Sequence, residues 1–158
     1  MLEIHLKGCN KCNKIPTLGH LPRLKVLQLI EGMDHVTCIG TEFYIDYSGE
    51  RSSNNGGDNG KNVIFPTLKK LSLLKLPNQV EWKDAMELTT IEMMFPCLVE
   101  LRIEICGQLT SAPCHFLSLK KLDVTNIKCM AFERIISKLS TLASLKIFNI
   151  SQLVCLQE

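Results

Sequence analysis

The 158-residue chain lacks any run of five like charges, and its formal net charge is only +2. A chain so close to neutral has no basic patch of the kind that binds nucleic acid or an anionic membrane surface. It also lacks the run of about 18 apolar residues that a membrane-spanning helix needs, and Glu3 and His5 interrupt its opening MLEIHLKG, unlike the apolar core of a signal peptide. We therefore expect a cytoplasmic protein that binds neither nucleic acid nor membranes.

The cysteines have few of the additional ligands and neighbours that a metal or redox site needs. Two of the 8 cysteines form a Cys9-x-x-Cys12 pair, but the chain has no second CxxC and no HxxxH to complete a zinc site. Its 4 histidines stand at no spacing from Ser, Cys or Asp that is typical of catalytic sites. We expect free thiols, no enzyme activity, no cofactor and no metal, and we keep a thiol or zinc protein as an alternative.

What the sequence does contain is one pattern that occurs six times, with apolar residues at relative positions 1, 4 and 6, as in Leu24, Leu27 and Leu29. The patterns start at residues 1, 24, 68, 98, 119 and 142. Three of the five spacings lie within the range of about 20 to 29 residues that is typical of leucine-rich repeats, and the other two indicate insertions. Positions 4 and 6 of a strand share a face, so each pattern predicts one short strand with an inward apolar pair.

Such strands bury their apolar pairs only by stacking on one another. We predict an α/β repeat solenoid, a single leucine-rich repeat domain over residues 1–158 that forms a horseshoe arc of about six irregular repeats. A parallel sheet lines its concave side, and irregular or short helical segments form its convex side. Residues 83–94 and 131–139 have helix-like spacing, and the aromatic then Gly-, Asn- and Ser-rich residues 41–62 predict a flexible polar insertion.

The alignment of the patterns also gives the CxxC pair a structural interpretation. Cys9 falls where the fourth repeat has Cys106, and Cys12 falls where it has Leu109. Position 9 is the turn that leaves the strand, where leucine-rich repeats carry Asn or Cys. We therefore expect both cysteines of the pair to fill the core. The first and last patterns should instead leave their apolar residues open, namely Met1, Ile4, Leu6, Leu142, Leu145 and Ile147.

Strand positions 3, 5 and 7 should face outward and form three rows across the concave side, where solenoids bind their partners. Position 7 carries Ile30, Leu74 and Phe148, apolar residues that favour contact with a protein. The alternatives are packing beneath the 41–62 insertion or against a missing neighbouring repeat. The predicted protein-binding residues are Val26, Gln28, Ile30, Lys70, Ser72, Leu74, Glu100, Arg102, Glu104, Lys121, Asp123, Lys146 and Phe148.

Three longer stretches are distinctive: LPRLKVLQLIEGMDHVTCIGTEFY (21–44), FPTLKKLSLLKLPNQVEWKD (65–84) and FPCLVELRIEICGQLTSAP (95–113). They resemble the leucine-rich repeat region of plant intracellular immune receptors of the coiled-coil, nucleotide-binding class of disease-resistance proteins. In that family a repeat ending in GMxxVxxIGxEFY precedes a variable polar insertion, and the next repeat opens with FPxLxxL and closes near EW. Both features occur here.

The resemblance implies a non-catalytic recognition and autoinhibition module of an immune receptor that acts in plant defence. Its expected protein partners are a pathogen effector, a guarded host protein or the receptor's own nucleotide-binding domain. The family's phosphate-binding loop and coiled coil have no counterpart in this sequence, so nucleotide binding is not carried over and the chain looks like a fragment. The alternatives are an F-box-like leucine-rich repeat substrate adaptor and a truncated gene product without a function of its own.

Overall fold

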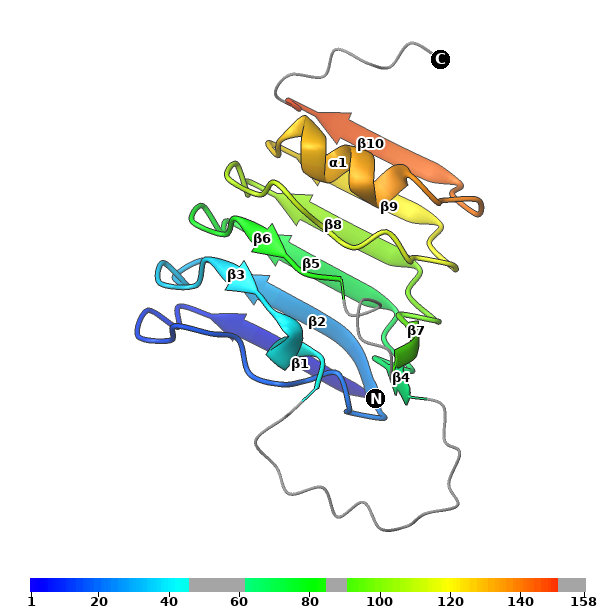
Figure 1. The fold of residues 1–158 in the computed structure, drawn as a ribbon, viewed down its shortest axis with the longest axis horizontal. Helices are drawn as coiled ribbons and strands as arrows, with labels where there is room; N and C mark the ends of the chain where they lie inside the picture. Colours follow the sequence, from blue (N-terminus) through cyan, green and yellow to red (C-terminus); the bar gives the residue numbers. More distant parts are fainter. Residues whose placement is uncertain (46–61, 85–90, 151–158) are drawn as a thin grey trace.

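A six-stranded sheet is the main feature of the computed structural model, which describes residues 1–45, 62–84 and 91–150. All neighbouring strands are parallel, and their order across the sheet is the order of the chain (Figure 1). Each of the six apolar patterns contributes one strand, as predicted. The strands are β1 (Leu2–Lys7), β2 (Leu24–Ile30), β5 (Lys70–Leu74), β8 (Glu100–Glu104), β9 (Lys121–Thr125) and β10 (Ser144–Phe148).

The register of the sheet confirms the inward positions of the pattern. Position 4 pairs with position 4 of the next strand, so that Leu27 lies between Ile4 and Leu71. In the four central patterns every residue at positions 1, 4 and 6 is at most 1% exposed. Burial of each such side chain stabilises the fold by roughly 1.5 to 3 kcal/mol, so these rows form the centre of the core.

The two outermost strands are covered on one side only. Their apolar residues are all at least partly exposed, and Leu145 of β10 is 44% exposed although its equivalents in the central strands are buried. The predicted opening of both ends of the stack is therefore confirmed for the described residues. The cause is the sheet order, because β1 and β10 each have one neighbouring strand instead of two.

The chain returns between strands along the face that carries positions 4 and 6. Two small parallel sheets lie there, β3 (Cys38–Ile39) with β6 (Glu81–Trp82) and β4 (Asn62–Ile64) with β7 (Ile91–Met94), together with the 3-10 helix η1 (Thr41–Phe43) and the helix α1 (Cys129–Ile136). Figure 1 shows β3, β6 and α1 in front of the main sheet. We name this side the return side.

Helix α1 confirms the helix predicted over residues 131–139, although it begins and ends earlier. Cys129, Phe132 and Ile135 recur every three residues and are buried, whereas Met130 between them is exposed. This spacing places one apolar stripe of the helix against the core. The helix begins before the predicted residue 131 because its buried stripe starts at Cys129.

The helix predicted over residues 83–94 is wrong where the structure describes it. Residues 91–94 form β7, which pairs with β4, and residues 83 and 84 are not helical. Met94 and Phe95 are buried, and the amide of Phe95 donates to the carbonyl of Ile64. Pairing with a neighbouring repeat thus overrides the local helical spacing. Residues 85–90 lie outside the described residues.

The flexible insertion predicted over residues 41–62 is wrong at both of its ends. Phe43 and Tyr44 are at most 1% exposed, and the hydroxyl of Tyr44 donates to the carbonyl of Lys83 at 2.6 Å. Aromatic burial explains why the first residues of the insertion belong to the core. At the other end, Asn62 is the first residue of β4. The rest of this prediction, residues 46–61, lies outside the described residues.

An aromatic column runs through the return side. The rings of Phe43 and Phe65 have centroids 5.0 Å apart, and those of Phe95 and Phe116 are 5.5 Å apart. Phe65, Phe95 and Phe116 each stand three residues before the first leucine of a pattern. The column therefore repeats with the strands and ties successive return segments together.

The strands end in a left-handed turn at position 8 of the pattern. Five of the six patterns have a positive φ there, from 55° at Ile105 to 71° at Gly8, and the second pattern uses Gly32 one residue later. The amide at this position donates to a carbonyl of the next strand end, as Lys75 does to Glu104 at 2.8 Å. Gly and Asn adopt this conformation readily, whereas a β-branched residue such as Ile105 is strained in it.

The core prediction for the CxxC pair is wrong for Cys12, which is exposed, and holds only in part for Cys9, which is half-buried. In the fourth repeat Cys106 and Leu109 are fully buried, and the Cys106 thiol donates to the carbonyl of Leu73 at 3.7 Å. The difference follows from position in the sheet, because the turn after the edge strand β1 packs against one neighbour only. No two of the described cysteines form a disulfide.

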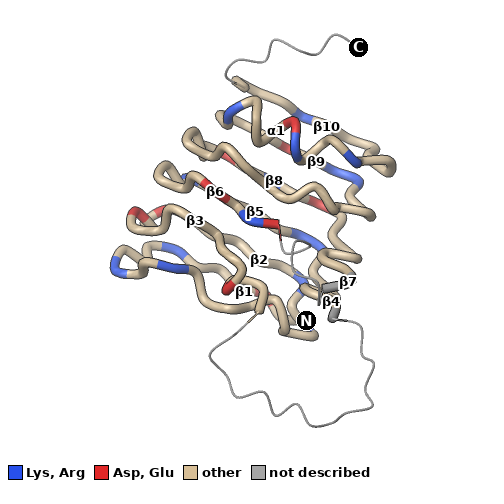
Figure 2. Tube along the Cα trace, in the orientation of Figure 1, with Lys and Arg blue, Asp and Glu red and all other residues tan. Residues whose placement is uncertain are grey.

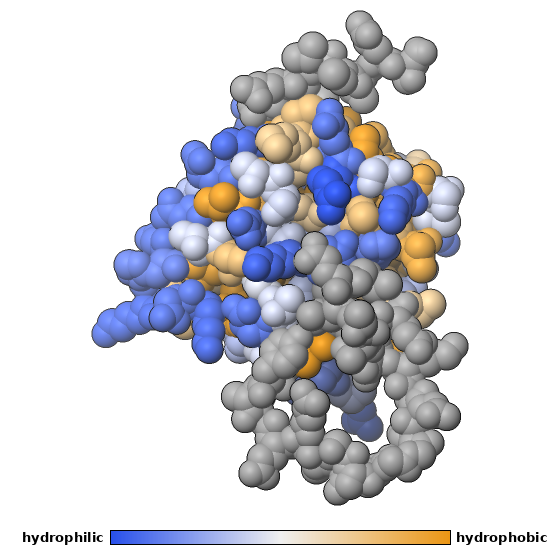
Figure 3. Space-filling view, in the orientation of Figure 1, coloured by the Kyte–Doolittle hydropathy of each residue, from blue (hydrophilic) through white to orange (hydrophobic). Residues whose placement is uncertain are grey.

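The surface mixes both charges. Lys and Arg are interspersed with Asp and Glu over the stack (Figure 2), and the apolar residues in view on the return side form separate small patches (Figure 3). No helix within the described part of the chain is long and apolar enough to cross a membrane.

Candidate functional site: the open face of the main sheet

Positions 3, 5 and 7 of the pattern occupy the face of the main sheet opposite the return side, which we name the open sheet face. The strand register joins them into three rows, as predicted. All the predicted protein-binding residues therefore lie together on this face. The rows are Glu3, Val26, Lys70, Glu100, Lys121 and Ser144; His5, Gln28, Ser72, Arg102, Asp123 and Lys146; and Lys7, Ile30, Leu74, Glu104, Thr125 and Phe148.

Polar side chains in the first four strands are paired with one another. Nδ1 of His5 lies 2.7 Å from Oε1 of Gln28 in the next strand. Within β8, the guanidinium of Arg102 donates to Oε1 of Glu104 at 2.7 and 3.0 Å. A third pair joins Lys70 to Glu100 at 3.8 Å. Exposed pairs of this kind contribute about 0 to 1 kcal/mol, so they add little to the stability of the fold.

The charges on the last two strands are not paired in this way. Lys121, Asp123 and Lys146 form no ion pair with any other described residue. Phe148 stands at the end of β10 with 70% of its surface exposed. Aromatic residues such as Phe148 are enriched in protein–protein interfaces, whereas lysine and aspartate are depleted there.

The third row also carries the apolar pair that the sequence singled out. Ile30 and Leu74 are directly paired in register, and both are half-buried. The third row thus carries an apolar pair across β2 and β5, and the next residue in this row is Glu104 of β8. The alternative in which the 41–62 insertion covers this row concerns residues 46–61, which lie outside the described part of the chain.

A hollow of about 540 Å³ lies at the strand-end turns. Within it, the carboxylate of Glu31 lies 3.6 Å from Nζ of Lys7 and 4.0 Å from Nζ of Lys75. Ile105 adds an apolar wall and is 44% exposed. This hollow, which lies beside the third row, was missed in the sequence because only strand positions were considered. Ile105, an isoleucine at a turn position, was the signal that could have indicated it. The lining residues are Gly8, Asn10, Glu31, Gly32, Asp34, Lys75, Pro77 and Ile105.

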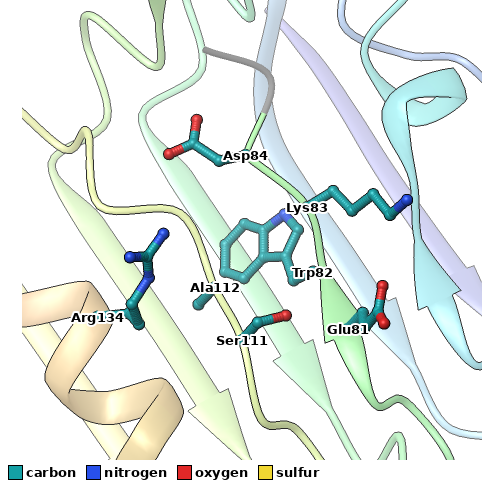
Figure 4. Close-up of a pocket in the computed structure, with 7 residues that line it drawn as sticks. All are labelled: Glu81, Trp82, Lys83, Asp84, Ser111, Ala112 and Arg134. Carbon is teal, nitrogen blue, oxygen red and sulfur yellow. The ribbon is translucent and has the colours of Figure 1, made fainter. Parts of the chain in front are cut away.

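A smaller hollow of about 180 Å³ lies on the return side, and Trp82 is central to its lining (Figure 4). Close to it, Nε2 of His115 lies 3.4 Å from Oδ2 of Asp84. Burial raises the pKa of the neighbouring Tyr44 well above its ordinary value of 10. The His115–Asp84 pair was missed because its members are 31 residues apart in the sequence. The lining residues are Glu81, Trp82, Lys83, Asp84, Ser111, Ala112 and Arg134.

Comparison with known proteins adds a relationship to this geometry. No protein-family model matches the chain, and no solved structure matches it significantly. The chain is 32% identical over 148 residues to an Arabidopsis thaliana protein named "Putative disease resistance RPP13-like protein 1", which covers 79% of this chain and 13% of that protein. A second Arabidopsis thaliana protein, also named as a putative disease resistance protein, is 32% identical over 107 residues, which cover 68% of this chain and 6% of its own length. The chain is therefore related to plant disease resistance proteins and spans a small part of their length.

Proposed function

We propose that the chain is a leucine-rich repeat solenoid segment that recognises another protein through its open sheet face in plant defence. The observation that carries this proposal is the unbroken register of three side-chain rows across six strands. The relationship to disease resistance proteins supports the defence role. The proposed partners are a pathogen effector, a guarded host protein or the receptor's own nucleotide-binding domain, which the segment would hold inactive in the cytoplasm.

The construction of the sheet suits recognition without catalysis. Asp123 belongs to the open sheet face, whereas Leu122 and Val124 on either side of it fill the core. A substitution in a row therefore changes what the surface binds without changing the packing that holds the strand. A rigid frame with replaceable side chains is the arrangement that a recognition module needs.

The size of the face sets a condition on the partner. Six strands spaced about 4.8 Å apart, each with about five residues, cover a flat area of roughly 500 Å². We propose that the partner also contacts the hollow at the strand-end turns, where Glu31, Lys75 and Ile105 lie beside the third row. This contact would help the interface to reach the roughly 800 Å² of accessible surface that each partner of a stable complex buries.

A capture experiment with plant extracts tests the proposal. The bait is the 158-residue chain, and the test variant is Ile30→Asp with Leu74→Asp. The matched control is Val80→Asp with Leu117→Asp, which adds the same charges at exposed apolar residues outside the three rows. We expect the wild type and the control to retain the same partner and the test variant to lose it, while circular dichroism shows that all three fold.

The source of the captured protein distinguishes the partner classes. An effector is captured only from infected tissue, a guarded host protein from healthy and infected tissue alike, and a nucleotide-binding domain is identified by its own sequence. Equal capture by the test variant and the wild type contradicts the proposal. If the test variant does not fold, Phe148→Asp takes its place, because this side chain is 70% exposed and contributes little to the core.

A further inference from the structure

Asp84, Cys114 and His115 bring three chemically different metal-binding atoms together on the return side. Oδ2 of Asp84 lies 3.4 Å from Nε2 of His115 and 3.9 Å from Sγ of Cys114. The three ligand atoms all lie within 4.8 Å of one another. Asp84 and Cys114 are buried, whereas His115 is partly exposed. No other group of three such residues occurs within residues 1–45, 62–84 and 91–150.

We propose that these three residues bind a zinc ion. Zinc is held at about 2.0 to 2.1 Å by nitrogen and oxygen and at about 2.3 Å by sulfur, so two ligands of a tetrahedral ion lie roughly 3.3 to 3.6 Å apart. The carboxylate of Asp84 already lies at 3.4 and 3.9 Å from the other two ligand atoms. The separation between the ligand atoms of Cys114 and His115 is at most 4.8 Å and would close by about 1.2 Å or less.

The chemistry of the donor set favours zinc over calcium and magnesium. A thiolate and an imidazole suit zinc, whereas calcium and magnesium require oxygen ligands throughout. Three protein ligands leave a fourth position for water or another donor. The partly exposed ring of His115 marks the side from which an ion can enter.

A catalytic Cys–His–Asp arrangement would need a different geometry. In such a site the thiol donates to the imidazole, and the carboxylate binds the far side of the ring. Here the thiol of Cys114 and the ring of His115 both approach the same oxygen of Asp84. The carboxylate, and not the imidazole, is the group that the other two approach, so this is not the geometry of a catalytic Cys–His pair.

The surrounding fold holds the ligands in place without the ion. Asp84 follows β6, and the amide of Trp82 donates to the carbonyl of Ser111 at 3.2 Å. The ring of Phe116, just after the other two ligands, packs 6.0 Å from that of Trp82. Figure 4 shows Asp84, Trp82 and Ala112 on these two adjoining segments. Zinc would therefore cross-link two successive return segments, on the side away from the open sheet face and independently of any partner bound there.

Metal titration of the 158-residue chain tests the site. With a non-thiol reductant present, we expect one zinc ion per chain by metal analysis after dialysis. When the free zinc concentration is a hundred times Kd, Tm should rise by about 5 to 10 °C. Cobalt in place of zinc should give a thiolate-to-cobalt charge-transfer band and the strong visible bands of a four-coordinate ion. Cys114→Ser should remove the charge-transfer band, and His115→Ala and Asp84→Asn should each weaken binding at least tenfold.

The matched control is Cys9→Ser with Cys12→Ser, which removes the CxxC pair and leaves the proposed ligands untouched. We expect this variant to bind zinc and cobalt as the wild type does. Loss of the metal in this control would assign the ion to the CxxC pair and overturn the proposal, as would binding that persists in Cys114→Ser. Absence of binding at micromolar free zinc overturns it as well. His115→Ala keeps the test valid if Cys114→Ser does not fold, because His115 is partly exposed.

Discussion

The rings of Phe65 and Phe95 stack with centroids 5.2 Å apart and an angle of 9° between their planes. Phe43 and Phe116 extend this pair into the aromatic column, and Tyr44 and Trp82 meet Phe95 edge-on at 6.3 Å. Aromatic pairs contribute about 0.5 to 1.5 kcal/mol beyond the area that they bury. Phe95 thus takes part in more of these ring contacts than any other described residue.

Replacement of Phe95 by alanine should destabilise the fold more than replacement of any exposed ring. Phe95 is fully buried, so its removal leaves a cavity between neighbouring rings and should lower the free energy of unfolding by about 3 to 5 kcal/mol. Urea unfolding followed by circular dichroism measures the change. Phe148→Ala serves as the control, with an expected change within about 0.5 kcal/mol. Equal losses in the two variants would show that the column does not carry this stability.

Ile105→Asn should stabilise the protein. Ile105 has a φ of 55° and is 44% exposed, so the β-branched side chain is strained and buries little apolar area. Two other strands already use asparagine at the same turn, at Asn126 and Asn149. Relief of the left-handed strain should raise the free energy of unfolding by about 1 kcal/mol in urea titrations.

Leu117→Asn is the control for this prediction. Leu117 is an exposed apolar residue that does not have a positive φ. The same substitution at this position should leave stability unchanged or lower it slightly. A stabilisation of similar size at both positions would assign the effect to lost surface hydrophobicity rather than to the backbone.

Stability should fall at alkaline pH because of Cys106. Burial raises the pKa of this thiol from 9.0 to about 11, so the folded protein keeps a proton that the unfolded chain loses in this window. The stabilisation is complete below pH 9 and disappears as the pH rises through about 11, a loss of about 2 to 3 kcal/mol. Urea unfolding at a series of pH values should show a shallower decline for Cys106→Ala, and identical slopes would contradict the assignment.

Thiol labelling of the folded chain should separate the cysteines by exposure. Cys12 and Cys97 are exposed and should react first with a disulfide reagent, while Cys106 and Cys129 are buried and should react only after unfolding. Mass spectrometry of peptides from partly labelled protein identifies the order. A protected Cys12 would mean that the turn after β1 is covered in solution.

The sequence predicted the main sheet well because one periodic pattern determines it. An apolar residue at positions 4 and 6 fixes which face of a strand is buried, and a shift by one residue would expose Leu27 and Leu29 together. The same constraint placed the three rows of the open sheet face in register. Side chains whose neighbours lie on equivalent positions of the next repeat could therefore be predicted from spacing alone.

The return side was predicted less well because it has no such period. Residues 91–94 have helical spacing, yet they pair as a strand with β4 of the previous repeat. Phe65 and Phe95 were visible as parts of a recurring FP, but their stacking depends on the path of the chain between them. Asp84 and His115 meet only because two return segments of different length adjoin. Contacts between segments without a shared register need the folded structure.

The strand register is the same whether consecutive patterns start 21 or 44 residues apart. Extra residues between β2 and β5 leave Ile30 paired with Leu74, just as the shortest connection leaves Glu104 paired with Thr125. The hydrogen-bonded ladder thus isolates the rows from changes in loop length. Insertions and deletions in the connections can therefore change the return side of this molecule while the same residues still share each row of the open sheet face.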